Sequence, residues 1–164
     1  MSTPRRYAAG TGVTATKSRA EIESLLKRHG ATSFVSGWDD ELSRAALVFR
    51  LAGRHFRLEV SQAQEKDVPP TARYEAPAQH KARVGKWIAG EERRRWRALL
   101  LVIKAKLEMI ASGESSVERE FLADMLLPNG DTVATSILPR IAESYASGKM
   151  PRRLLPALGS GDDK

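Results

Sequence analysis

The chain has 164 residues, with 27 Lys and Arg against 20 Asp and Glu, a formal net charge of +7 and a pI near 10.0. It contains no cysteine, which excludes disulfides, thiolate catalysis and cysteine-rich zinc sites. The longest apolar run, residues 98–103, is far shorter than the roughly 20 residues that span a bilayer, and MSTPRRYAAGTG does not resemble a secretory signal. We therefore expect a soluble, cytoplasmic protein without membrane association, and its basic balance favours a polyanionic partner.

Residues 1–61 are predicted to form a flexible arm followed by a small folded unit. Residues 1–17 are rich in Ser, Thr, Ala and Gly and lack periodicity, which indicates a flexible arm. Residues 18–61 predict an α-β-β-β unit. Its helix, residues 19–29, is expected to follow Ser18 as N-cap, with Glu21 at the capping-box position.

Three short segments after the helix are predicted to be strands: residues 33–38, 45–51 and 54–60. Ala52–Gly53 predicts a tight turn between the second and third strands. Apolar and polar residues alternate in these two strands, so one face of an antiparallel meander is apolar and the helix can cover it. Arg50 and Arg57 lie on the other, open face.

The composition of the chain changes after residue 61. Prolines and a low apolar content mark residues 62–78 as a linker. A helical region is predicted over residues 79–158, built on one long amphipathic helix at 91–111. Apolar residues recur on one face of this helix, at Trp96, Leu99, Leu100, Ile103, Leu107 and Ile110. Gly85 and Gly90 disfavour helix ahead of it, so a separate short helix is an alternative there.

Two further helices are expected near the C-terminus. Ser115 is the predicted N-cap of the first, with Glu118 at the reciprocal position. Asn129–Gly130 then predicts a tight turn over residues 128–131. The fold class that follows is α+β, with an N-terminal helix, a three-stranded antiparallel meander and a helical C-terminal half.

The last helix is predicted over residues 132–146, closed by Gly148. Pro139 either kinks this helix or lies in its first turn, if the helix starts at Ser136. Residues 159–164 are predicted to be a disordered tail.

Catalytic and metal-binding patterns are lacking. The three histidines are far apart and have no ligand neighbours at helical spacing, so no metal site and no cofactor are predicted. There is no G-x-S-x-G turn and no phosphate-binding glycine loop. The acidic residues at 39–41 lie in a predicted loop, where Asp favours turn formation. Glu91 and Glu92 lie in the first turn of the predicted long helix, where negative charge interacts favourably with the helix dipole. We therefore expect a protein that is not an enzyme.

A basic cluster is the best functional signal. We expect nucleic acid to be bound by cations and one tryptophan of the helical region together with two arginines of the open sheet face: Arg83, Lys86, Trp87, Arg93, Arg94, Arg97, Arg50 and Arg57. Guanidinium groups bind phosphates well, so binding should be largely independent of sequence.

Other interpretations of the cluster stay open. Trp96 begins the apolar register and is expected in the core, whereas Trp87 is equally suited to the core and to stacking on an unpaired base. Arg93 and Arg94 are equally suited to pairing with Glu91, Glu92 or other acidic residues.

Several stretches carry a resemblance to a known family. They are the segment over residues 6–60, and RWRALLLVIKAKLE, EREFLADMLLPNGDTV and AESYASGKMPRRLLP. Together they resemble a family of short, uncharacterised proteins encoded by tailed phages and prophages. The resemblance implies a context of DNA replication or recombination, and DNA in preference to RNA as partner. It also implies the alternative of a protein–protein module that binds or inhibits a host factor. In that case we expect an exposed apolar or aromatic patch around Trp87, Tyr74 and Val84 to form the contact.

Overall fold

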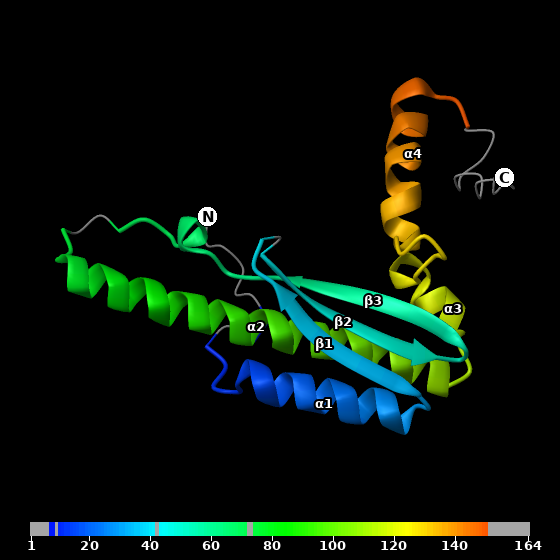
Figure 1. Ribbon diagram of the computed structural model, residues 1–164, viewed down its shortest axis with the longest axis horizontal. Coiled ribbons are helices and arrows are strands. Elements are labelled where there is room, and N and C mark those ends of the chain that lie inside the picture. The colour runs from blue at the N-terminus through cyan, green and yellow to red at the C-terminus, as the bar shows by residue number, and fades with distance from the viewer. Residues whose placement is uncertain (1–6, 9, 42, 72–73, 151–164) are drawn as a thin grey trace, which may run out of the picture.

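The computed structural model describes residues 7–8, 10–41, 43–71 and 74–150. In chain order the elements are α1 (Ala15–Arg28), β1 (Ser33–Asp39), β2 (Arg44–Leu51), β3 (Arg54–Ser61), η1 (Glu65–Asp67), α2 (Pro77–Ala111), α3 (Val117–Glu120), η2 (Leu122–Asp124) and α4 (Val133–Ser147). The expected α+β class is confirmed: a helix and a three-stranded sheet precede a long helix and further helices (Figure 1). The predictions for residues 1–6 and 151–164, including the tail at 159–164, lie outside the described residues.

The first helix begins four residues before its predicted start. Thr14 is the N-cap, and its Oγ1 accepts a hydrogen bond from the backbone N–H of Lys17 at 3.1 Å. Ser18, the predicted cap, is fully buried inside α1 on the same face as Ile22 and Leu26. The prediction was wrong because Ser and Thr both suit the capping role, and only the packing of α1 on the sheet places Ser18 inside.

The sheet is an antiparallel meander in the order β1-β2-β3. Phe49 of β2 pairs with Phe34 on one side and Phe56 on the other. The turn at Ala52 and Gly53 has φ values of 48° and 76°, as a two-residue hairpin turn of type I′ requires. All three strands lie within one residue of their predicted ends.

The core lies between one face of the sheet and the helices α1 and α2. The rings of Phe49, Phe56 and Phe121 pack together with centroids 5.4–5.6 Å apart. Trp96 is 6% exposed, which confirms its predicted place in the core. No helix lies over the opposite face of the sheet among the described residues, as Figure 1 shows.

The long helix α2 is continuous over 35 residues, and its N-terminal part extends beyond the sheet (Figure 1). The alternative of a separate short helix ahead of Glu91 was wrong, because Gly85 and Gly90 both lie inside α2. Each glycine costs about 1 kcal/mol relative to alanine, which the unbroken backbone hydrogen bonding and the buried Val84 offset. Pro77 stands at the first helical position, where its missing N–H costs nothing.

The next predicted helix is a single turn, α3, followed by the 3₁₀ turn η2. Ser116 caps α3, since its Oγ accepts a hydrogen bond from the Arg119 N–H at 3.2 Å, so the predicted cap Ser115 was one residue early. The chain leaves helical geometry at Phe121 because this ring is fully buried against the sheet.

The turn and the last helix match their predictions closely. Gly130 has a φ of 85° and donates its N–H to the Leu127 carbonyl at 2.9 Å. Thr132 caps α4 and Gly148 ends it in the left-handed conformation. Pro139 lies inside α4, so the alternative start at residue 136 was wrong.

The last helix is largely exposed to solvent. No residue of α4 is buried, and Leu138 and Tyr145 are 60% and 88% exposed. The helix stands away from the sheet and contacts mainly η2 (Figure 1). Tertiary packing therefore covers little of its apolar surface.

Candidate nucleic-acid interface

The arginines in the middle of α2 are held by a carboxylate of the same helix. The Nη2 atom of Arg94 lies 2.5 Å from Glu91 Oε1, and the Nε atom of Arg95 lies 3.3 Å from the same oxygen. The hydrogen bond from Arg94, and then that from Arg95, lowers the pKa of Glu91 to about 2 although burial opposes the shift. The pairing also raises the pKa of Arg94. Of the open interpretations, the pairing of Arg94 with Glu91 is confirmed.

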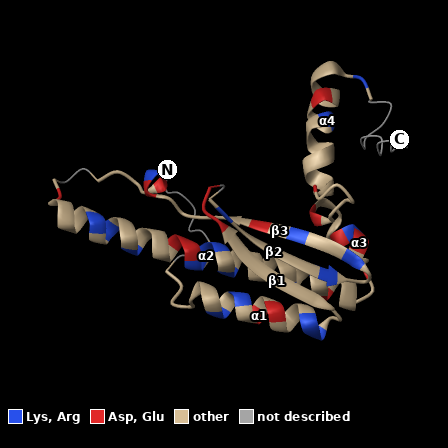
Figure 2. Ribbon diagram, viewed as in Figure 1, with Lys and Arg blue, Asp and Glu red and all other residues tan. Residues whose placement is uncertain are grey.

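The other cations of this run tie α2 to distant segments. Arg97 Nη1 lies 2.6 Å from Glu21 Oε2 of α1. Arg93 Nε donates to the Thr11 carbonyl at 3.1 Å, so it contacts the segment before α1 and not Glu92. Figure 2 shows acidic and basic residues side by side in the middle of α2. This run therefore stabilises the crossing of α2 with its neighbours.

The protruding part of α2 carries three more of the predicted residues. Arg83 pairs with Glu75 at 2.8 Å and donates to the Pro69 carbonyl at 3.0 Å. The hydrogen bond that Arg83 donates to the Glu75 carboxylate lowers the pKa of Glu75. Lys86 is exposed, and Trp87 is half-buried. The arginine here fastens the chain that leads into α2.

The apolar patch expected around Trp87 does not form as predicted. Val84 is only 8% exposed and belongs to the buried residues, whereas Tyr74 is 95% exposed. Val84 is a buried residue of α2, in the part of the helix that precedes Glu91.

Arg50 and Arg57 lie on the open face of the sheet, opposite to the face that α1 and α2 cover. Arg57 pairs with Glu59 at 3.3 Å and donates to the Gly130 carbonyl at 3.1 Å. Arg50 is exposed and has no ion pair with any residue the structure describes. The sheet separates these two arginines from those of α2, so the predicted residues do not form one continuous surface.

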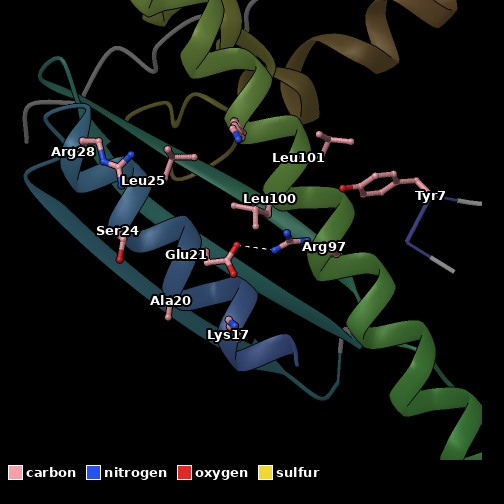
Figure 3. A pocket seen from close by; sticks show the side chains of 11 residues that line it. Tyr7, Lys17, Ala20, Glu21, Ser24, Leu25, Arg28, Arg97, Leu100 and Leu101 are labelled. Atoms are coloured by element: carbon pink, nitrogen blue, oxygen red, sulfur yellow. Dashed lines mark hydrogen bonds and ion pairs between the residues drawn. The ribbon is translucent and has the colours of Figure 1, made fainter. Parts of the chain in front are cut away.

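A basic groove instead lies between α1 and α2, on the side of these helices that faces away from the sheet (Figure 3). It has a volume of about 480 Å³. The cations that line it are Lys17, Arg28, Arg97 and Lys104. The carboxylate of Glu21 is the one acidic side chain among the described lining residues, and it is already paired with Arg97. The groove is therefore strongly positive.

Three of these cations are free to bind. Lys17, Arg28 and Lys104 are exposed, and within the described part of the chain none of them makes an ion pair. A phosphate can therefore bind them without breaking an internal contact, in contrast to the paired Arg94 and Arg97.

The site predicted from the sequence left out three cations of this groove, Lys17, Arg28 and Lys104. Lys17 and Arg28 lie at helical spacing with Glu21 and Ser24 along one polar flank of α1, a pattern that is visible in the sequence. That flank resembles any solvated helix face, so it indicates a site only once Lys104 of α2 is known to lie across from it.

Comparison with known proteins finds no matching family model, no matching curated protein and no matching solved structure. Within the part of the chain that the structure describes, no group of three or more His, Asp and Glu is arranged to hold a metal ion. No helix among the described residues is long and apolar enough to cross a membrane.

Proposed function

We propose that the protein binds nucleic acid, largely without sequence specificity, as a non-enzymatic accessory protein, and that the groove between α1 and α2 is its binding site. The observation that carries this proposal is the set of free cations, Lys17, Arg28 and Lys104, that converge on one groove from two helices. Such cations displace condensed counterions from a phosphate backbone, which drives binding that depends steeply on salt. The resemblance to short phage proteins favours DNA as the partner and a context of replication or recombination.

The proposal changes the site that the sequence indicated. Arg93, Arg94 and Arg97 are engaged by Thr11, Glu91 and Glu21. Replacing these three arginines therefore breaks contacts inside the protein, and weaker binding in that variant does not identify a phosphate contact.

The test is a triple variant of the groove, Lys17→Ala, Arg28→Ala and Lys104→Ala. Each lost phosphate contact lowers the slope of log affinity against log salt by about 0.9. We expect affinity for DNA to fall about tenfold or more at 50 mM salt, and the slope to flatten by about 2–3. Fluorescence anisotropy of labelled DNA at salt concentrations between about 50 and 200 mM measures both quantities.

The matched control removes three exposed lysines elsewhere, in the variant Lys66→Ala, Lys81→Ala and Lys149→Ala. It has the same net charge as the groove variant, so it separates a local contact from the general attraction of a basic protein. If both variants lose the same affinity and slope, the groove is not the site. Absence of DNA binding by the unmodified protein would refute the function itself.

A protein–protein module that binds a host factor is the second candidate, favoured by the exposed apolar side of α4. Leu138, Ile141 and Tyr145 are all exposed on this helix. If the protein binds a host factor through α4, a partner that it binds in the presence of nuclease should no longer bind to the Leu138→Glu variant. It is retained with Val102→Glu, which changes an exposed apolar residue of α2. Loss with both variants, or with neither, would contradict a site on α4.

A further inference from the structure

The groove between α1 and α2 has an apolar floor as well as basic edges. Leu25 of α1 is half-buried on this floor and Leu100 of α2 is buried, while Leu101 is 44% exposed on the side of α2 where Tyr7 lies (Figure 3). A duplex presents phosphates and base edges at its surface, while the apolar faces of its bases are stacked inside. The floor therefore has no suitable partner in a duplex, but it suits the exposed bases of an unpaired strand.

An aromatic ring completes the groove. Tyr7 lines it together with Arg97 and Leu101, and its side chain is 52% exposed. Every nucleobase has an aromatic face, so an exposed ring beside a basic groove binds unpaired bases by stacking without selecting a sequence.

The segment that carries Tyr7 is attached to α2. Thr11 donates its N–H to the Ala8 carbonyl at 3.1 Å, which closes the turn that follows Tyr7. Arg93 donates in turn to the Thr11 carbonyl at 3.1 Å. Arg93 is thereby a positioning residue, because it fixes the segment that places the ring at the groove.

From these contacts we infer that the strand bound between α1 and α2 is single-stranded. One base stacks on Tyr7, and the neighbouring phosphates bind Lys17, Arg28 and Lys104. The inference rests on the proposed function and specifies its substrate. The volume of about 480 Å³ is in the range of pockets that enclose one small ligand, which suits a base and its sugar better than the width of a duplex.

The test compares one labelled DNA sequence of about 16 nucleotides as a single strand and as a duplex, by anisotropy at fixed low salt. We expect the single strand to bind about tenfold more tightly. Tyr7→Ala should weaken single-strand binding about tenfold, leave duplex binding unchanged and keep the salt slope, because stacking releases no counterions. Tyr7→Phe should retain the affinity, since the ring remains.

Tyr74→Ala is the matched control, because Tyr74 is 95% exposed and does not line the groove. Equal affinity for both forms of DNA, with no effect of Tyr7→Ala, would overturn the inference. The proposed function would survive that result if the triple groove variant still weakens binding. If the unmodified protein binds neither form, the function and the inference both fail.

Discussion

Replacing Phe121 by alanine is expected to lower the free energy of unfolding by about 3–5 kcal/mol. Phe121 is fully buried, and its ring lies 5.6 Å from Phe49 and 5.5 Å from Phe56. The ammonium of Lys106 also lies 4.8 Å from the centre of the ring. Removal of the ring leaves a cavity where α3, α2 and the sheet meet, and this cavity adds to the loss of apolar burial.

Urea unfolding followed by tryptophan fluorescence and circular dichroism measures this loss. Leu122→Ala is the control, because Leu122 is the next residue and is 53% exposed. The Leu122→Ala substitution should lower the free energy of unfolding by less than about 1 kcal/mol. A cost for Phe121→Ala below about 1 kcal/mol would contradict the aromatic cluster.

Replacing Glu91 by glutamine is expected to lower the free energy of unfolding at pH 7 by about 2 kcal/mol, after an allowance for solvent screening. The hydrogen bonds of Arg94 and Arg95 lower the pKa of Glu91 from 4.5 to about 2 in the folded protein. The folded state therefore favours the charged carboxylate. Its contribution is complete above about pH 4.5 and is lost as the pH falls toward 2.

The pH dependence is the part of this prediction that identifies its cause. The difference in the free energy of unfolding between Glu91→Gln and the unmodified protein should be largest near neutral pH and should shrink between pH 4.5 and 2. Urea unfolding at a series of pH values measures it. Glu92→Gln is the control, because Glu92 has no ion pair with the described residues. A difference that stays constant with pH would show that the ion pairs do not stabilise the fold.

Local sequence patterns were sufficient to predict the sheet and most helix ends. The alternation in residues 45–60 predicted β2 and β3 to within one residue, because side chains on a strand alternate between a buried and an open face. The turn at Asn129–Gly130 and the end of α4 at Gly148 likewise depend on residues that favour a left-handed conformation.

Local patterns failed where two residues were equally suitable. Thr14 and Ser18 can each cap a helix, and Ser115 and Ser116 differ by one position. Burial decided both cases, because packing of α1 and of Phe121 against the sheet fixes where each helix begins or ends.

The sequence by itself determined the α+β order of elements, the apolar face of α2 and the excess of positive charge. Only the tertiary structure decided what that charge contacts. Glu21 and Thr11 contact arginines that lie 76 and 82 residues later in the sequence. Lys17 and Lys104 instead line one groove, and neither makes an ion pair with the residues that the structure describes. Periodicity depends on neighbours within a few turns, but an electrostatic partner depends on distance in space, which the folded chain sets.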